Sequence, residues 1–106
     1  MNPVAAILPC GTRLHLQHGP IDLIISADGQ RERAFEAANA CFQTVLTELV
    51  GELDALKQPI TPTANCPNGA VAQRMHAAAM IYVGDSFLTR MAAVAGSVAD
   101  TVLNAI

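Results

Sequence analysis

Two short alternating stretches separated by a turn sequence constrain the fold of this chain more than any other feature. In RLHLQHGPIDLIIS, leucine or isoleucine recurs at every second position on both sides of His18-Gly19-Pro20. This period is typical of β-strands that bury one face, and the Gly-Pro pair is a turn signal. The sequence therefore predicts an antiparallel pair of strands over residues ~12–18 and ~21–27.

The apolar period changes to that of a helix directly after this pair. Apolar residues mark one face of the segment ~31–56, and Pro59 follows its end. They are Phe35, Ala38, Phe42, Val45, Leu49, Leu53 and Leu56. After a Pro-rich connection, further helices are predicted over ~69–82 and ~92–106, with a break at 83–86. The predicted fold class is α+β, with two layers: an antiparallel sheet and a long helix packed across it.

The composition indicates one domain with an unusually apolar surface. The chain has 106 residues, of which 52% are hydrophobic and 14% are charged. This is less charge than a free-standing domain of this size usually carries. We therefore expect part of the surface to be buried in a homo-oligomer or against a missing C-terminal portion. The apolar ending TVLNAI, which has no helix stop signal, likewise suggests that the fold is incomplete in this chain.

Charge and composition argue against two classes of partner. The net charge is −3 with no basic patch and no Trp, so we expect no nucleic-acid binding. No apolar run reaches membrane-spanning length, so we expect no membrane association. No basic residue precedes Cys10, which indicates a mature cytoplasmic start rather than a secretion signal. Three cysteines, an odd number, fit free thiols in a reducing compartment.

Histidines and cysteines offer metal ligands, but none has the spacing of a metal motif. We therefore predict no metal site. His15 and His18 are best interpreted as part of a solvated strand face, and Cys41 as a small core residue. Cys66 lies in the Pro-rich loop and is expected to be exposed, but nucleophilic catalysis would require a base that the sequence does not identify.

The candidate site lies in the C-terminal segment, where small residues gather between positions 92 and 99. Ser97-Val98-Ala99-Asp100 has the form of a capping box, which predicts a helix start near Gly96 or a few residues earlier. Free amides there would attract a phosphate, with Thr89 adding a hydroxyl and Arg90 a charge. Two alternatives remain open. Asp100 can be a plain cap residue, and the small residues can serve tight helix packing, which spacing alone favours.

Two stretches, RLHLQHGPIDLIISADG and FLTRMAAVAGSVADTVL, carry a family resemblance. They resemble an uncharacterised family of ApbE-like proteins that is distantly similar to the FAD:protein FMN transferases. AVAGSVAD is similar to the Gly-rich segment of the transferases, with Gly96 and Asp100 at the matching glycine and acid and Ala95 in place of the lysine. The resemblance implies a T-fold/ApbE-like domain whose sheet joins with symmetry-related copies. It also implies FAD or FMN with Mg²⁺, and that this chain is the N-terminal portion of a longer protein.

Two hypotheses of function follow. The first is a flavin- or nucleotide-phosphate-binding domain, with FMN-transferase-like chemistry if it is catalytic. Its site would be lined by Thr89, Arg90, Gly96, Ser97 and Asp100. The second is a non-catalytic structural or oligomerisation module, in which the small-residue stretch is a packing surface.

Overall fold

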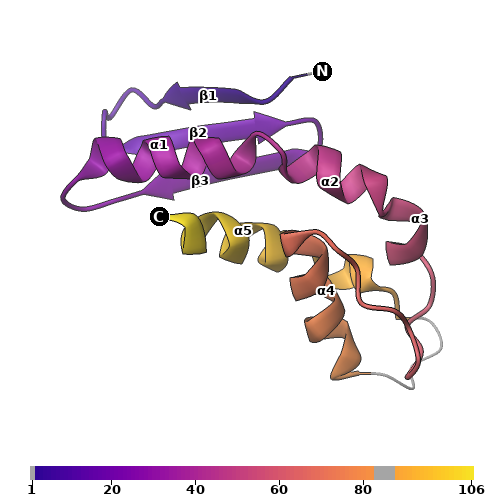
Figure 1. The fold of residues 1–106 in the computed structure, drawn as a ribbon. Helices are drawn as coiled ribbons and strands as arrows, with labels where there is room; N and C mark the ends of the chain where they lie inside the picture. The colour runs from indigo at the N-terminus through magenta and orange to yellow at the C-terminus, as the bar shows by residue number, and fades with distance from the viewer. Residues whose placement is uncertain (1, 83–87) are drawn as a thin grey trace. The chain divides into compact units, whose positions relative to one another are not determined.

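The computed structural model describes residues 2–82 and 88–106, so the predicted break at 83–86 lies outside the described residues. Within these described residues, three strands come first and five α-helices follow (Figure 1). The elements are β1 (Val4–Ile7), β2 (Arg13–His18), β3 (Ile21–Ser26), α1 (Arg31–Phe42), α2 (Val45–Gly51), α3 (Leu53–Leu56), α4 (Ala70–Met80), the 3₁₀-helix η1 (Arg90–Ala93) and α5 (Val94–Ala105). Two compact units divide the chain: unit 1 comprises Met1–Leu46 and Val102–Ile106, and unit 2 comprises Thr47–Thr101.

The sheet of unit 1 is antiparallel, in the order β1-β2-β3. The predicted hairpin is confirmed as β2 and β3, with Leu14 opposite Ile25 and Leu16 opposite Leu23. Gly19 takes a φ of 59° in the turn, a conformation that favours glycine. The sequence reading missed β1, because all four of its residues are exposed and it shows no alternation between apolar and polar residues.

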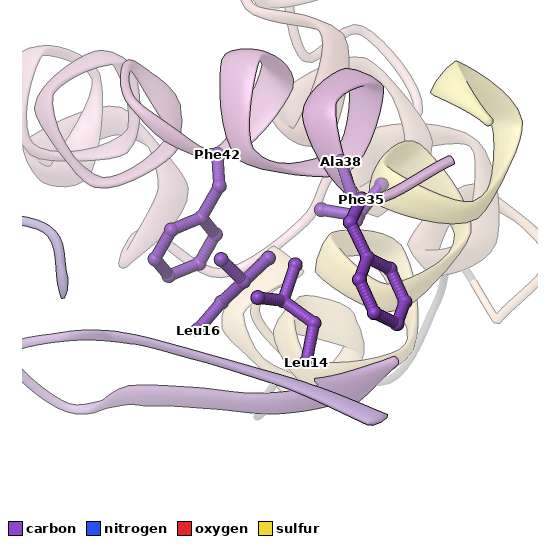
Figure 2. Packing of buried hydrophobic residues seen from close by; sticks show 6 residues of the cluster. Leu14, Leu16, Phe35, Ala38 and Phe42 are labelled. Atoms are coloured by element: carbon purple, nitrogen blue, oxygen red, sulfur yellow. The ribbon is translucent and has the colours of Figure 1, made fainter. Parts of the chain in front are cut away.

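The core of unit 1 lies between the sheet and α1, which lies along β2 and β3 (Figure 1). Figure 2 shows Phe35, Ala38 and Phe42 of α1 directed toward Leu14 and Leu16 of β2. Val102 completes this cluster, and Cys41 packs against it as expected. Fully burying a Val, Leu or Phe side chain stabilises the fold by about 1.5–3 kcal/mol. The α+β class with an antiparallel sheet and helices is therefore confirmed.

His18 is not on a solvated strand face, so that interpretation was wrong for this residue. It is 6% exposed because residues 14, 16 and 18 alternate onto the same buried face of β2. Its ring makes an edge-on contact with Phe42, with ring centroids 6.5 Å apart. Its Nδ1 is buried and has no hydrogen-bond partner among the described residues.

The single long helix predicted over ~31–56 is also wrong, because the segment forms α1, α2 and α3. The second break falls after Gly51, where glycine weakens a helix. Glu52 then leaves helical geometry (φ −116°, ψ 10°), and its carboxylate accepts hydrogen bonds from the backbone amides of Asn68 (2.8 Å) and Gly69 (2.7 Å). These amides stand at the start of α4, so the carboxylate caps a helix that begins far along the chain.

The C-terminal helix begins at the earlier of the two predicted starts, a few residues before Gly96. η1 starts at Arg90 and runs into α5, which starts at Val94. Ser97 therefore lies inside a helix and is not its N-cap. None of the described helices is long and apolar enough to cross a membrane.

Candidate functional site

A hollow in unit 2 lies along the facing stripes of two helices. On α4 the stripe is 74, 77 and 78, and on η1 and α5 it is 92, 93, 96, 97 and 100, both with helical spacing. We call this the α4–α5 hollow; its volume is about 460 Å³. Its lining residues are Arg74, Ala77, Ala78, Ala92, Ala93, Gly96, Ser97 and Asp100. Because most of these side chains are small, the helix backbones come close to the surface.

Three of the five predicted site residues meet here: Gly96, Ser97 and Asp100. A Cβ built on Gly96 would have no atom within 4 Å, so among the described residues Gly96 borders open space and is not a helix-packing contact. Ser97 is 5% exposed, and its backbone carbonyl accepts a hydrogen bond from Thr101 Oγ1 at 2.7 Å.

The hydroxyl of Ser97 has no hydrogen-bond partner among the described residues. In the described ranges, the buried side-chain atoms without a partner are His18 Nδ1 and Arg90 Nε, and the Ser97 oxygen is not one of them. Its oxygen therefore keeps access to the hollow that the residue lines. The hydroxyl can therefore donate to a ligand that enters the hollow.

The sequence reading missed Arg74, the cation of this hollow. Arg74 is half-buried on α4, and its Nη1 donates to Thr101 Oγ1 at 3.2 Å. Asp100 is exposed on the facing helix and forms no ion pair with Arg74 within the described ranges. Spacing could have marked Arg74, since it falls three and four residues before Ala77 and Ala78, but nothing in the sequence placed that stripe against α5.

Arg90 lies away from the hollow and braces unit 2 internally. It is 5% exposed, and it donates from Nη2 to the carbonyl of Ala55 (2.8 Å) and from Nη1 to that of Asn65 (2.9 Å). Nη1 also lies 3.2 Å from His76 Nδ1, which must accept because a guanidinium has no lone pair to offer. Ala55 is at the C-terminal end of α3, where the helix dipole favours a cation.

Thr89 also lies outside the set of lining residues. It pairs with Pro59 in an isolated antiparallel bridge, so its backbone joins the Pro-rich segment to the start of η1. The predicted amide cradle at Gly96 is not present either. η1 precedes α5, and the amides of Ala92 and Val94 already donate to Thr89 and Met91. A guest in the hollow would therefore meet side chains rather than open amides.

A second hollow, of about 640 Å³, lies in unit 1 at the start of α1. Its lining residues are Ile7, Gly11, Gln30, Arg31, Glu32, Arg33 and Phe35. Next to Gly11, the exposed thiol of Cys10 accepts hydrogen bonds from Arg13 Nε (3.5 Å) and Thr12 Oγ1 (3.3 Å).

Hydrogen bonds lower the pKa of Cys10 to about 6. The bond from Arg13 is the largest cause, and those from Thr12 come next. Cys10 is therefore mainly a thiolate at neutral pH. The sequence reading had considered Cys66 as an exposed thiol but not Cys10. The sequence signal for a reactive Cys10 was Arg13, three residues later, with Gly11 between them.

The family comparison is informative at this point. A family model described as AbpE bacteria matches residues 5–106. The chain belongs to this family. No curated protein and no solved structure matches the chain.

Membership of the AbpE bacteria family corrects the resemblance inferred from sequence. The expected ApbE-like relationship is wrong, because the matching family is a different one and nothing found links the chain to FMN transferases. In the structure, AVAGSVAD covers the last residue of η1 and the first seven residues of α5. The T-fold architecture and the choice of a flavin depended on that resemblance and lose its support.

The residues of this AbpE bacteria family member form no metal cluster in the part of the chain that the structure describes. No group of three or more His, Cys, Asp or Glu side chains comes together there. The lining residues of the α4–α5 hollow also include no His or Cys. Its chemistry is that of a binding surface with one cation, one hydroxyl and one carboxylate.

Proposed function

We propose that unit 2 binds a small phosphate-bearing molecule in the α4–α5 hollow. The observation that carries this proposal is the hydroxyl of Ser97, which has no partner among the described residues and belongs to a residue only 5% exposed that lines the same hollow as Arg74. The accessible hydroxyl of Ser97 and the half-buried guanidinium of Arg74 line the same hollow, so both can donate to one anion. Hydrogen bonds to a charged acceptor contribute about 1.5–3 kcal/mol each.

Arg74 suits a phosphate because its planar guanidinium presents five donors. One nitrogen, Nη1, donates to Thr101 Oγ1, which fixes the side chain against α5. The remaining N–H groups can take two phosphate oxygens in a paired arrangement. The contact with Thr101 therefore positions the arginine without using up its donors.

The size of the hollow supports a small organic phosphate. A volume of about 460 Å³ falls within the range of small-molecule sites, roughly 300–1,000 Å³. Alanine and glycine walls allow a ligand to approach the helix backbones closely. Since no His or Cys lines the hollow, we propose binding rather than a chemical step.

A titration with adenosine monophosphate, followed by amide chemical shifts, tests this proposal. We expect shifts at Arg74, Ser97 and Gly96, and Arg74→Gln should weaken binding about tenfold, which corresponds to ~1.4 kcal/mol. Arg33→Gln removes the same charge from unit 1 and is the matched control. Equal affinities of the two variants, or shifts confined to the hollow at α1, would contradict the proposal.

A second candidate function, homo-oligomerisation, is favoured by one feature of unit 1. β1 is an edge strand whose four residues are exposed and uncharged, with Val4 59% and Ile7 55% exposed. Edge strands usually carry charges or cover that prevent pairing with other chains. The described residues of β1 carry no charge, which suits an assembly contact. Such a contact would involve unit 1 and is compatible with a ligand in unit 2.

A further inference from the structure

We infer that the ligand of the α4–α5 hollow is a sugar phosphate, whose hydroxyls donate to Asp100 while its phosphate is held by Arg74 and Ser97. This inference rests on the proposed function and specifies the class of molecule. It starts from Asp100, the lining residue whose negative charge would repel an anion that lacks donor groups.

Asp100 is a poor neighbour for a phosphate alone. An ionised carboxylate only accepts hydrogen bonds, and a second negative charge beside it is repelled. Among the described residues Asp100 forms no ion pair, so Arg74 does not neutralise it. A ligand gains from both charges only if donor groups accompany its phosphate.

The spacing along α5 fits such a ligand. Ser97 and Asp100 both line the hollow, one helical turn apart, which places their Cβ atoms roughly 5–6 Å from each other. A phosphate at Ser97 would therefore carry the hydroxyls of an attached sugar to the carboxylate. Hydrogen bonds from hydroxyls to a carboxylate are charge-assisted and short.

A divalent cation is the competing occupant of Asp100, since Mg²⁺ binds through one or two carboxylates and a ligand phosphate. No second acidic, His or Cys residue lines the hollow. Direct donation from hydroxyls needs only the single carboxylate that is present.

The experiment compares ribose 5-phosphate with ethyl phosphate, which has no hydroxyl, in the presence of EDTA. For the wild-type chain we expect ribose 5-phosphate to bind about tenfold more tightly. Asp100→Ala should abolish that preference while ethyl phosphate still binds. Glu36→Ala, another exposed acid on a helix, should keep the preference.

The outcomes separate the two proposals. If neither phosphate binds, or if Arg74→Gln has no effect on either, the proposed function is overturned. If both bind equally to the wild type, or if Asp100→Ala keeps the preference, only the sugar inference is overturned. A preference that is absent in EDTA and appears only when Mg²⁺ replaces the EDTA would also overturn it, in favour of a bridging cation.

Discussion

At the residue scale, Cys10 shows how a short turn changes the chemistry of one side chain. Its thiol accepts hydrogen bonds from Arg13 and Thr12, which stabilise the thiolate. These bonds lower the pKa of Cys10 to about 6, so the thiolate dominates above that pH and is lost as the pH falls through it.

We therefore predict that iodoacetamide modifies Cys10 with a midpoint near pH 6. Peptide-resolved mass spectrometry provides the readout, and the exposed Cys66 is an internal comparison. Arg13→Gln should move the midpoint for Cys10 upward, because it removes the largest cause of the shift. Superimposable pH profiles for the two cysteines would contradict this account.

Gly96 provides a second prediction at this scale. It lies inside α5 with open space where a Cβ would stand, so Gly96→Ala should raise the free energy of unfolding by about 0.5–1 kcal/mol. Gly96→Leu should fill the hollow and block adenosine monophosphate while leaving the fold intact. Urea unfolding measured beside ligand titration checks both, and a large loss of stability in Gly96→Ala would show that the position is packed.

At the element scale, Glu52 joins the end of one helical segment to the start of another. Its two carboxylate oxygens accept from the amides of Asn68 and Gly69 at the start of α4. We predict that Glu52→Ala lowers the free energy of unfolding by about 0.5–2 kcal/mol, the usual range for a lost N-terminal cap. Chemical denaturation measures this, with Glu36→Ala as control; equal effects of the two substitutions would argue against a cap.

Arg90 is the other contact that organises elements in unit 2. Arg90 bonds the Ala55 and Asn65 carbonyls from two different nitrogens, whereas lysine has a single nitrogen, so Arg90→Lys should lose at least one of these bonds. A hydrogen bond from a charged donor contributes about 1.5–3 kcal/mol, and we therefore predict a loss of about that size in the free energy of unfolding. His76→Gln, which keeps an acceptor near Nη1, should lose much less. If Arg90→Lys has the same free energy of unfolding as the wild type, these hydrogen bonds contribute little to stability.

At the scale of the whole molecule, the exposed edge strand bears on self-association. If β1 is an assembly contact, Ile7→Lys places a charge on an edge that otherwise has none, and we predict weaker association. Sedimentation over a range of protein concentrations measures this, with Ile24→Lys on the opposite edge strand as control. A wild-type chain that stays monomeric at every concentration would exclude this contact.

The sequence by itself determined the features that depend on local periodicity. The β2–β3 hairpin and the apolar face of α1 follow from residues two, or three to four, positions apart, because backbone geometry fixes which side chains share a face. The gathering of Gly96, Ser97 and Asp100 on one surface has the same origin. Each of these needs only neighbours along the chain.

Only the tertiary structure decided which distant residues meet. It placed Arg74 against Thr101, Arg90 against Ala55 and Asn65, and Glu52 at the start of α4. The predicted long helix is broken where Glu52 turns to cap α4. Arg90, predicted as a phosphate ligand, instead stabilises unit 2 internally. The reason is physical: a buried donor or carboxylate takes whichever partner the fold brings within hydrogen-bond distance, and sequence separation does not encode that distance.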